Sequence, residues 1–205
     1  MKYYAVQKGR EPGIYTTWKD CQAQVYGFAG ALFKSFPTLA EAERFMNHAL
    51  GAEEENNQNI EAQLQQIDTQ SVIAFVDGSY QHASKRFSYG AVLFTSEGKH
   101  TLSQAYDDPQ KISARNVAGE IAGVQAAILW AVEKGKKKIS VYYDYEGIDK
   151  WARGIWKTNQ ILTQEYKAFI DEYAKHIQIQ FCHVKAHTGI TYNEEADQLA
   201  KEALC

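Results

Sequence analysis

The chain has 205 residues and a formal net charge of -3, with 45% hydrophobic and 23% charged residues, which predicts a packed globular protein. No apolar stretch approaches the roughly 18 to 20 residues that span a membrane, and the N-terminus lacks the apolar core of a secretory signal. We therefore expect neither a membrane-spanning helix nor a secretory signal. The three cysteines, Cys21, Cys182 and Cys205, share no metal-ligand spacing and favour a reducing, cytoplasmic setting.

The charge is unevenly distributed along the chain. Residues 1–50 carry 6 basic and 4 acidic side chains, residues 51–70 carry 5 acidic and no basic ones, and residues 71–205 carry 16 of each. Residues 51–70 are also rich in Glu, Asn and Gln, a composition that cannot bury a core. We therefore expect a small domain at 1–48, an acidic and partly helical linker at 49–70, and a larger domain at 71–205.

The small domain alternates strand-like and helical stretches. The sequences YYAVQKG, GIYTTW and LFKSFP predict three strands, and residues 19–25 predict a helix between the second and the third. TLAEAERFMNHAL predicts another helix, with Thr38 as its N-cap and Glu41 in the capping-box position. A domain of this size buries little surface, so we expect it to be marginally stable.

The larger domain opens with VIAFV at residues 72–76, an apolar run typical of a buried strand. YGAVLFTS and KHTLSQAY follow as a meander with a tight turn at Glu97-Gly98. A long helix from Asn116, a strand KKISVYYDYE, two helices, a strand HIQIQFCHVK and a closing helix with Asn193 as its expected N-cap complete the order. This order predicts a mixed α/β sheet with an antiparallel half and parallel βα units, flanked by helices.

Four acids occupy strand ends or early helix turns: Asp77, Glu120, Asp144 and Asp197. If one edge of the sheet brings them together, protons or metal ions must neutralise the like charges. Oxygen ligands without Cys or His point to Mg²⁺ or Mn²⁺, and many nucleases use two such ions about 3.5 to 4 Å apart. Each acid also has an ordinary alternative, such as a turn former at Asp77 or a helix-dipole acid at Glu120.

Four motifs in order, FVDGSY, NVAGE, YYDYEG and VKAHTGITYNEEADQLA, give residues 71–205 a resemblance to type 1 ribonuclease H. The resemblance implies a ribonuclease H-like mixed five-stranded sheet and endonucleolytic cleavage of the RNA strand of RNA/DNA hybrids, leaving 3′-hydroxyl and 5′-phosphate ends. It places the acids that bind two Mg²⁺ ions, which Mn²⁺ can replace, at Asp77, Glu120, Asp144 and Asp197. It makes His187 the catalytic-loop histidine, able to carry protons near neutral pH.

Substrate contacts are expected beside these acids. Gly78 lacks a side chain and would let the substrate backbone approach, and the Ser79 hydroxyl would touch the RNA strand. By the resemblance, Asn116 contacts 2′-hydroxyls. Val117 stands where a second side-chain amide is common, and Tyr145-Glu146 stand where Ser and Gln are common, so hybrid contact here departs from the family pattern.

The N-terminal stretches YYAVQKGREPGIYTTWKDCQAQVYGF and LFKSFPTLAEAERF resemble the hybrid-binding, or viroplasmin-type, domain at the front of many ribonucleases H. The resemblance implies a small α+β domain in which Trp18 and Phe33 pack on DNA sugars and Lys34 meets a phosphate. Charge on phosphates and aromatic contact are suitable means of holding a hybrid. The alternative is that Trp18 and Phe33 belong to the core. Such domains can self-associate, so we expect a monomer or a weak dimer.

Two other functions stay open from the sequence. One is a hybrid or double-stranded RNA binding protein with an impaired nuclease domain, because the departures affect substrate contact. The other is a different enzyme of the same fold, such as a transposase or an exonuclease. The complete set of four acids together with His187 favours the nuclease.

Overall fold

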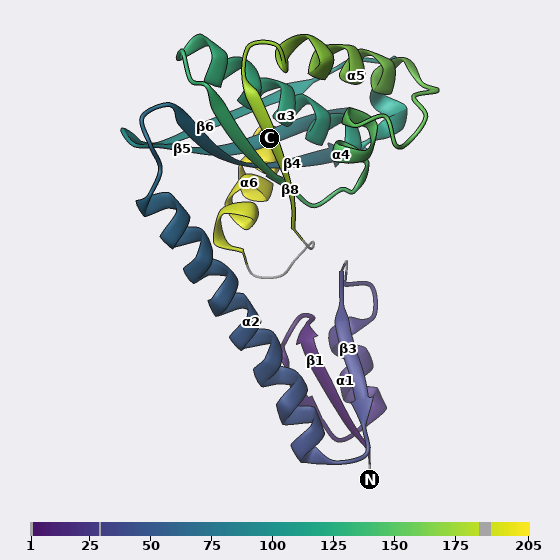
Figure 1. Cartoon of the computed structure of the whole chain (residues 1–205). Helices are drawn as coiled ribbons and strands as arrows, with labels where there is room; N and C mark the ends of the chain where they lie inside the picture. The colour runs from purple at the N-terminus through teal and green to yellow at the C-terminus, as the bar shows by residue number, and fades with distance from the viewer. Residues whose placement is uncertain (1, 29, 185–189) are drawn as a thin grey trace. The chain divides into compact units, whose positions relative to one another are not determined.

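The computed structural model describes residues 2–28, 30–184 and 190–205, and all of their side chains except those of 47–55. The chain divides into two compact units, Met1–Asn59 and Ile60–Cys205 (Figure 1). Within the described residues, no helix is both long enough and apolar enough to cross a membrane.

The smaller unit is built on a three-stranded antiparallel sheet of order β2-β1-β3. Its elements are β1 (Tyr3–Lys8), β2 (Gly13–Tyr15), α1 (Trp18–Val25), β3 (Leu32–Phe36) and the first part of α2 (Leu39–Gln65). A buried cluster of Val6, Cys21 and Val25 joins β1 to α1. The hydroxyl of Thr38 accepts a hydrogen bond from the Glu41 amide at 3.3 Å, as an N-cap of α2 does. The predicted small α+β fold is thus confirmed.

The α2 helix continues to Gln65, so most of residues 49–70 is helical. The division between the two units falls inside this helix, between Asn59 and Ile60. Beyond it, Ile60 is buried and Leu64 is partly buried in the larger unit. The segment is acidic in composition but carries an apolar stripe at its C-terminal end.

The larger unit contains the five-stranded sheet, in the order β6-β5-β4-β7-β8. The strands β4, β5 and β6 pair antiparallel, whereas β7 pairs parallel to both β4 and β8. The strands are β4 (Ser71–Gln81), β5 (Arg86–Thr95), β6 (Gly98–Tyr106), β7 (Lys138–Tyr143) and β8 (Gln178–His183). The helices are η1 (Ile112–Ala114), α3 (Asn116–Glu133), α4 (Gly147–Ala152), α5 (Ile161–Tyr173) and α6 (Thr191–Glu202). The predicted mixed α/β sheet flanked by helices is confirmed.

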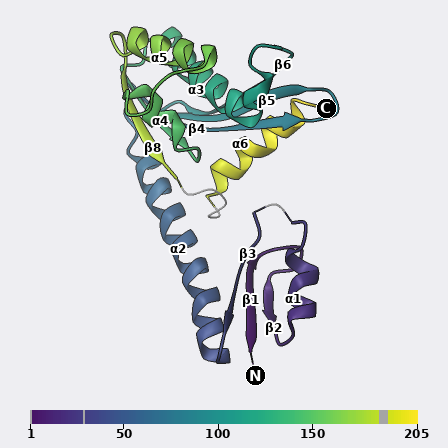
Figure 2. The same ribbon diagram turned by 90° about the vertical axis from the view of Figure 1, so that its right-hand side faces the viewer.

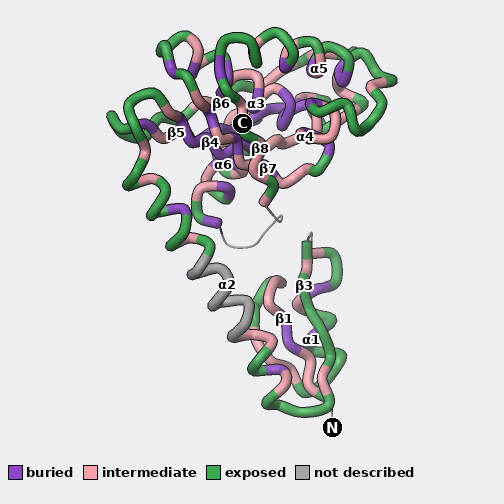
Figure 3. Tube along the Cα trace, viewed as in Figure 1, coloured by how far each residue is buried: buried purple, intermediate pink, exposed green. Residues whose placement is uncertain are grey.

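Side chains of β4 alternate between two apolar clusters on opposite faces of the sheet. Val72, Ala74 and Val76 pack with α3, whereas Ile73 and Phe75 pack with α6. Figure 2 shows α3 and α6 on opposite sides of the strands, and Figure 3 shows buried residues concentrated in the strands and their covering helices. The unbroken apolar run of β4 reflects this burial on both faces.

Two glycines let α3 approach the sheet more closely than side chains would allow. A Cβ at Gly78 would lie 2.2 Å from the Asn116 carbonyl oxygen and 2.4 Å from the Glu120 nitrogen. A Cβ at Gly119 would lie 2.0 Å from the Ser88 carbonyl oxygen. The glycine after Asp77 is therefore required by helix packing, a reason that the sequence did not suggest.

The predicted N-cap of the last helix is wrong. The α6 helix begins at Thr191, and its N-cap is Ile190, whose backbone is extended. Asn193 is buried within the first turn instead. The burial of Ile190 in the apolar cluster around Phe75 accounts for this earlier start better than a polar cap does.

Candidate active site

Two of the predicted acids lie where the parallel pairing of the sheet stops. The β4–β7 ladder ends at the pair Phe75 and Tyr142, and Asp77 and Asp144 each follow that pair by two residues. The β4 strand itself continues beyond Asp77, paired only with β5. Asp77 is thus a mid-strand residue at the edge of the parallel half, rather than the end of its strand.

The carboxylates of Asp77, Glu120 and Asp144 form one cluster. One oxygen from each lies within 4.8 Å of the other two. Glu120 lies on the α3 helix and is only 2% exposed. The close packing at Gly78 and Gly119 holds this part of α3 against β4 and β5, so backbone contact places Glu120 beside Asp77.

The cluster disfavours its own ionisation. Burial raises the pKa of Asp77 to about 7, and the nearby charge of Asp144 adds to this, although the Gly78 N–H donates to Asp77 Oδ1 at 2.6 Å and opposes it. Burial also raises the pKa of Glu120 well above its usual value, with contributions from Asp144 and Asp77. The cluster therefore holds its full negative charge near neutral pH only if a cation joins it.

The donor set fits a hard divalent cation. Glu120 Oε2 is buried and has no hydrogen-bond partner among the described residues. Such a buried, unpaired carboxylate oxygen is costly unless another group satisfies it. Three carboxylates without Cys or His match the ligands that Mg²⁺ and Mn²⁺ prefer.

Asp197 lies near this cluster but is not one of its three members. It is on α6, and its charge contributes to the raised pKa of Asp77. Its side chain is 32% exposed and forms an ion pair with Lys201 at 2.5 Å, one turn further along the helix. Sequence reasoning missed Lys201, although the spacing of four residues on a helix is a signal for such a pair.

The predicted substrate-contacting residues of the larger unit lie on β4 and α3, the elements that carry Asp77 and Glu120. Ser79 is partly buried on β4, and Asn116 is exposed as the first residue of α3. His187 lies outside the described residues, so its predicted role has no geometry here.

A pocket of about 310 Å³ is lined in part by Val117 and Tyr145, which directly follow Asn116 and Asp144 in the sequence. Its lining is Ala114, Val117, Tyr145, Trp151, Lys157, Asn159, Gln160, Leu162 and Thr163. The Tyr145 and Trp151 rings are 5.7 Å apart, and a Cβ at Gly147 would lie 2.4 Å from the Tyr145 ring. Two of the three departures from the family pattern, Val117 and Tyr145, thus line one pocket, and Gly147 makes room for the larger of them.

The smaller unit displays its predicted contact residues at the surface. Trp18 is 45% exposed and Phe33 is 40% exposed, and their rings are 5.8 Å apart. Lys34 on β3 is also exposed. The alternative in which the two aromatic residues form the core therefore does not hold for this unit.

Comparisons with known proteins agree with the division into two parts. The family model "RNase H" matches residues 69–205, and the model "Ribonuclease H1 N-terminal domain" matches residues 2–46. Ribonuclease H1 of Rattus norvegicus is 29% identical over 255 residues, covering 98% of this chain and 88% of its own length.

Two further relatives match one part each. Ribonuclease H of Saccharomyces cerevisiae is 50% identical over 44 residues, covering 22% of this chain and 13% of its own length. The crystal structure of RNase H1 from the halophilic archaeon Halobacterium salinarum NRC-1 is 26% identical, with a TM-score of 0.55, and covers 65% of this chain and 97% of its own. The chain belongs to the ribonuclease H family, and it is a ribonuclease H that carries an additional N-terminal domain of the ribonuclease H1 type.

Proposed function

We propose that the protein hydrolyses the RNA strand of RNA/DNA hybrids endonucleolytically by a two-metal-ion mechanism, giving 3′-hydroxyl and 5′-phosphate ends. Mg²⁺ is the proposed ion, and Mn²⁺ is expected to replace it. The observation that carries this proposal is the cluster of Asp77, Glu120 and Asp144, with one buried carboxylate oxygen left without a partner among the described residues.

The roles of the acids follow from their environments. Asp77, Glu120 and Asp144 would hold the metal ions, and Asp197 would complete the set from α6. When bound, the ions would supply the positive charge that favours ionisation of the attacking water and stabilises the leaving oxygen. The chain itself contributes fixed placement, because Glu120 lies on a helix packed backbone to backbone against β4 and β5.

Other residues of the larger unit have proposed roles in proton transfer and substrate contact. His187 is proposed to carry a proton between the site and solvent, since a histidine near its ordinary pKa exchanges protons at neutral pH. Ser79 and Asn116, which flank the acids along β4 and α3, would contact the RNA strand, as would the backbone at Gly78. Tyr145, on the pocket lined with Trp151 and Lys157, would replace contacts made by smaller residues elsewhere in the family.

The smaller unit is proposed to hold the hybrid. Its exposed Trp18 and Phe33 offer apolar surface for sugars, and Lys34 offers charge for a phosphate. A tethered second binding surface raises the local concentration of substrate at the catalytic unit. A monomer or weak dimer in the cytoplasm is part of the same proposal, in keeping with free thiols at Cys21, Cys182 and Cys205.

The test is a cleavage assay with a labelled RNA/DNA hybrid and Mg²⁺ or Mn²⁺. We expect the parent protein to cut the RNA strand internally and the Asp77→Asn variant to be inactive, with the end groups identified by mobility and enzymatic labelling. Double-stranded RNA in the same gel serves as the second candidate substrate. Binding of the hybrid without cleavage by the parent would instead support a binding protein with an impaired nuclease domain.

A further inference from the structure

The end of α2 belongs to the core of the catalytic unit. Ile60 is 5% exposed and clusters with Phe75, Ile190 and Ala196, on the face of the sheet that α6 covers. Leu64 and Ile67 pack against the same cluster. These three apolar residues precede the segment matched by the ribonuclease H family model, which starts at residue 69.

Two tyrosines hydrogen-bond to the same stretch of α2. The Tyr192 hydroxyl donates to Glu61 Oε1 at 2.6 Å, and the Tyr142 hydroxyl donates to Gln63 Oε1 at 2.7 Å. The hydrogen bond to Glu61 is the main reason that the pKa of Tyr192 is raised, to about 12. Two directional hydrogen bonds thus supplement the apolar packing of Ile60 and Leu64.

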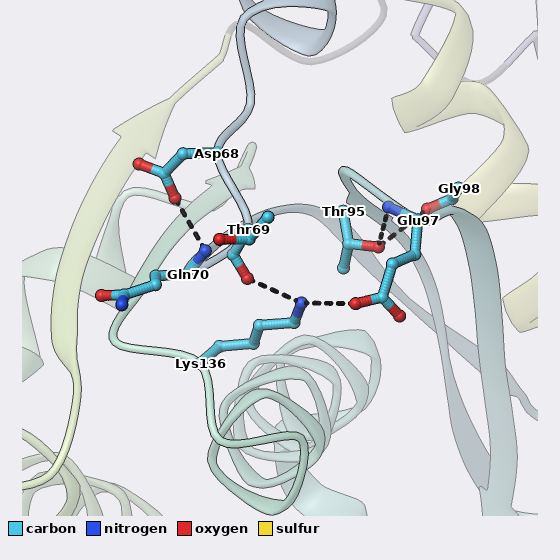
Figure 4. Close-up of polar contacts among 7 residues, drawn as sticks. All are labelled: Asp68, Thr69, Gln70, Thr95, Glu97, Gly98 and Lys136. Carbon is cyan, nitrogen blue, oxygen red and sulfur yellow. Dashed lines mark hydrogen bonds and ion pairs between the residues drawn. The ribbon is translucent and has the colours of Figure 1, made fainter.

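The segment between α2 and β4 is fixed as well. Lys136, a buried lysine, donates to the Thr69 carbonyl oxygen at 2.9 Å and forms an ion pair with Glu97 at 3.5 Å (Figure 4). The Gln70 amide donates to Asp68 Oδ1 at 2.9 Å, and the Gln70 carbonyl accepts from the Lys137 amide at 2.8 Å. Residues 60–70 are therefore held at both ends by the catalytic unit.

Tyr192 connects this stretch to the helix that carries Asp197. It is the second residue of α6, and Asp197 follows five residues later on the same helix. The centroid of its ring lies 4.6 Å from that of Phe94 and 5.5 Å from that of Phe75. The Lys99 ammonium lies 5.7 Å from the same centroid. The first turn of α6 is thus fixed by the sheet on one side and by Glu61 on the other.

We propose that residues 60–70 are an integral part of the catalytic unit and that Tyr192, hydrogen-bonded to Glu61, is a positioning residue that sets the placement of Asp197. This inference rests on the proposed function, in which Asp197 completes the metal-binding set. It assigns to the end of the acidic segment a role in the site, in place of the role of a spacer.

Full-length variants test the Glu61–Tyr192 pair. Tyr192→Phe and Glu61→Ala each remove the hydrogen bond while keeping the ring or the helix, Glu61→Gln keeps an acceptor, and Gln65→Ala is a matched change at an exposed position of the same helix end. The measurements are calorimetric titration with Mn²⁺ in the absence of substrate, kcat and KM on a labelled hybrid, and the thermal unfolding temperature.

We expect Tyr192→Phe and Glu61→Ala to weaken Mn²⁺ affinity about three- to tenfold. This range corresponds to the net free energy that one hydrogen bond contributes. At subsaturating Mn²⁺, kcat should fall by a similar factor while KM for the hybrid stays within about twofold. The double variant should match the single ones, because both changes remove one interaction. Glu61→Gln and Gln65→Ala should behave like the parent.

Several results would overturn the inference. One is parent-like Mn²⁺ affinity in Tyr192→Phe and Glu61→Ala, even if their unfolding temperatures drop, because the pair would then be structural only. Another is an additive effect in the double variant. If the parent binds Mn²⁺ but does not cut the hybrid, the proposed function fails, whereas the Mn²⁺ titrations still decide the role of Tyr192.

Discussion

The two units depart from the usual distribution of residues in opposite directions. The smaller unit leaves large aromatic side chains, Trp18 and Phe33, at its surface, although such residues are normally well buried. The larger unit buries acids, Glu120 almost completely and Asp77 in large part, although charged residues are normally exposed. Burying an acid costs stability unless a partner compensates it, whereas exposing a large aromatic pair leaves apolar surface free for contact. The contrast fits the proposed cation site in the larger unit and the proposed contact surface in the smaller one.

The comparison also separates the expected effects of mutation. Changes in the exposed aromatic pair should alter substrate binding with little effect on stability. Changes among the buried acids should alter the chemical step, and their neutralisation should make the metal-free protein more stable.

Glu120→Gln, like Asp77→Asn, should lower the rate of cleavage strongly. The amide keeps the shape of the side chain but removes a charge from the buried cluster. We expect kcat for hybrid cleavage to fall by on the order of 10²–10³-fold, the loss typical for one preorganised electrostatic group. Asp197→Asn should cost less, because Asp197 is partly exposed and paired with Lys201. Equal losses in the two variants would contradict the distinction between the cluster and Asp197.

Gly119→Ala should be the most destabilising of the small changes in α3. Its Cβ would lie 2.0 Å from the Ser88 carbonyl oxygen, a backbone atom that cannot move without displacing β5. We expect a loss of about 3 kcal/mol in the free energy of unfolding, at the upper end for overpacking. Gly123→Ala is the control on the same helix: its nearest contact is a side-chain carbon at 3.2 Å, so the change should stay within about 1 kcal/mol. Urea unfolding measures both.

Trp18→Ala should affect binding without affecting the chemical step. Aromatic contact with nucleic acid is worth roughly 1–3 kcal/mol by alanine substitution, so KM for the hybrid should rise about tenfold while kcat is unchanged. Because Trp18 is exposed, the unfolding temperature should change little. Tyr26→Ala, which removes a more exposed aromatic residue of the same unit, is the matched control. A large drop in stability for Trp18→Ala would show that the residue supports the core instead.

The pH dependence of stability should reveal the buried acids in the metal-free protein. The pKa of Asp77 is about 7 in the folded state, above the ordinary value of 3.8. Between these values the folded state binds more protons than the unfolded state, so the free energy of unfolding falls as pH rises from about 4 to about 7. Asp77→Asn should reduce this fall. At pH 8 its unfolding temperature should exceed that of the parent by about 2–4 °C for each kcal/mol gained in the free energy of unfolding.

Sequence patterns predicted the order of elements well, because apolar periodicity is strong in the larger unit. The apolar run of β4 and the tight turn between β5 and β6, which ends at Gly98, lie where they were expected. Their positions depend on local signals, namely burial on both faces of a strand and glycine at an element end. The same signals placed Asp77 and Asp144 at neighbouring points of the sheet.

The errors and omissions concern contacts between distant residues. Asn193 looked like an N-cap, but burial of Ile190 starts α6 earlier. The packing of Ile60 and the hydrogen bond from Tyr192 to Glu61 join parts of the chain more than 100 residues apart, which local composition cannot indicate. The close contact of Gly78 with Asn116 likewise depends on how α3 crosses the sheet.

Calorimetric titration with Mn²⁺ at pH 6 and pH 8 measures whether Asp77, Glu120 and Asp144 share bound divalent cations. We predict that the parent protein binds Mn²⁺ more tightly at pH 8, because binding displaces protons from carboxylates of raised pKa. We further predict that Glu120→Gln weakens this binding at least about tenfold, since it removes one charged ligand. Binding that is independent of pH and unchanged in Glu120→Gln would contradict a cation site shared by these three acids.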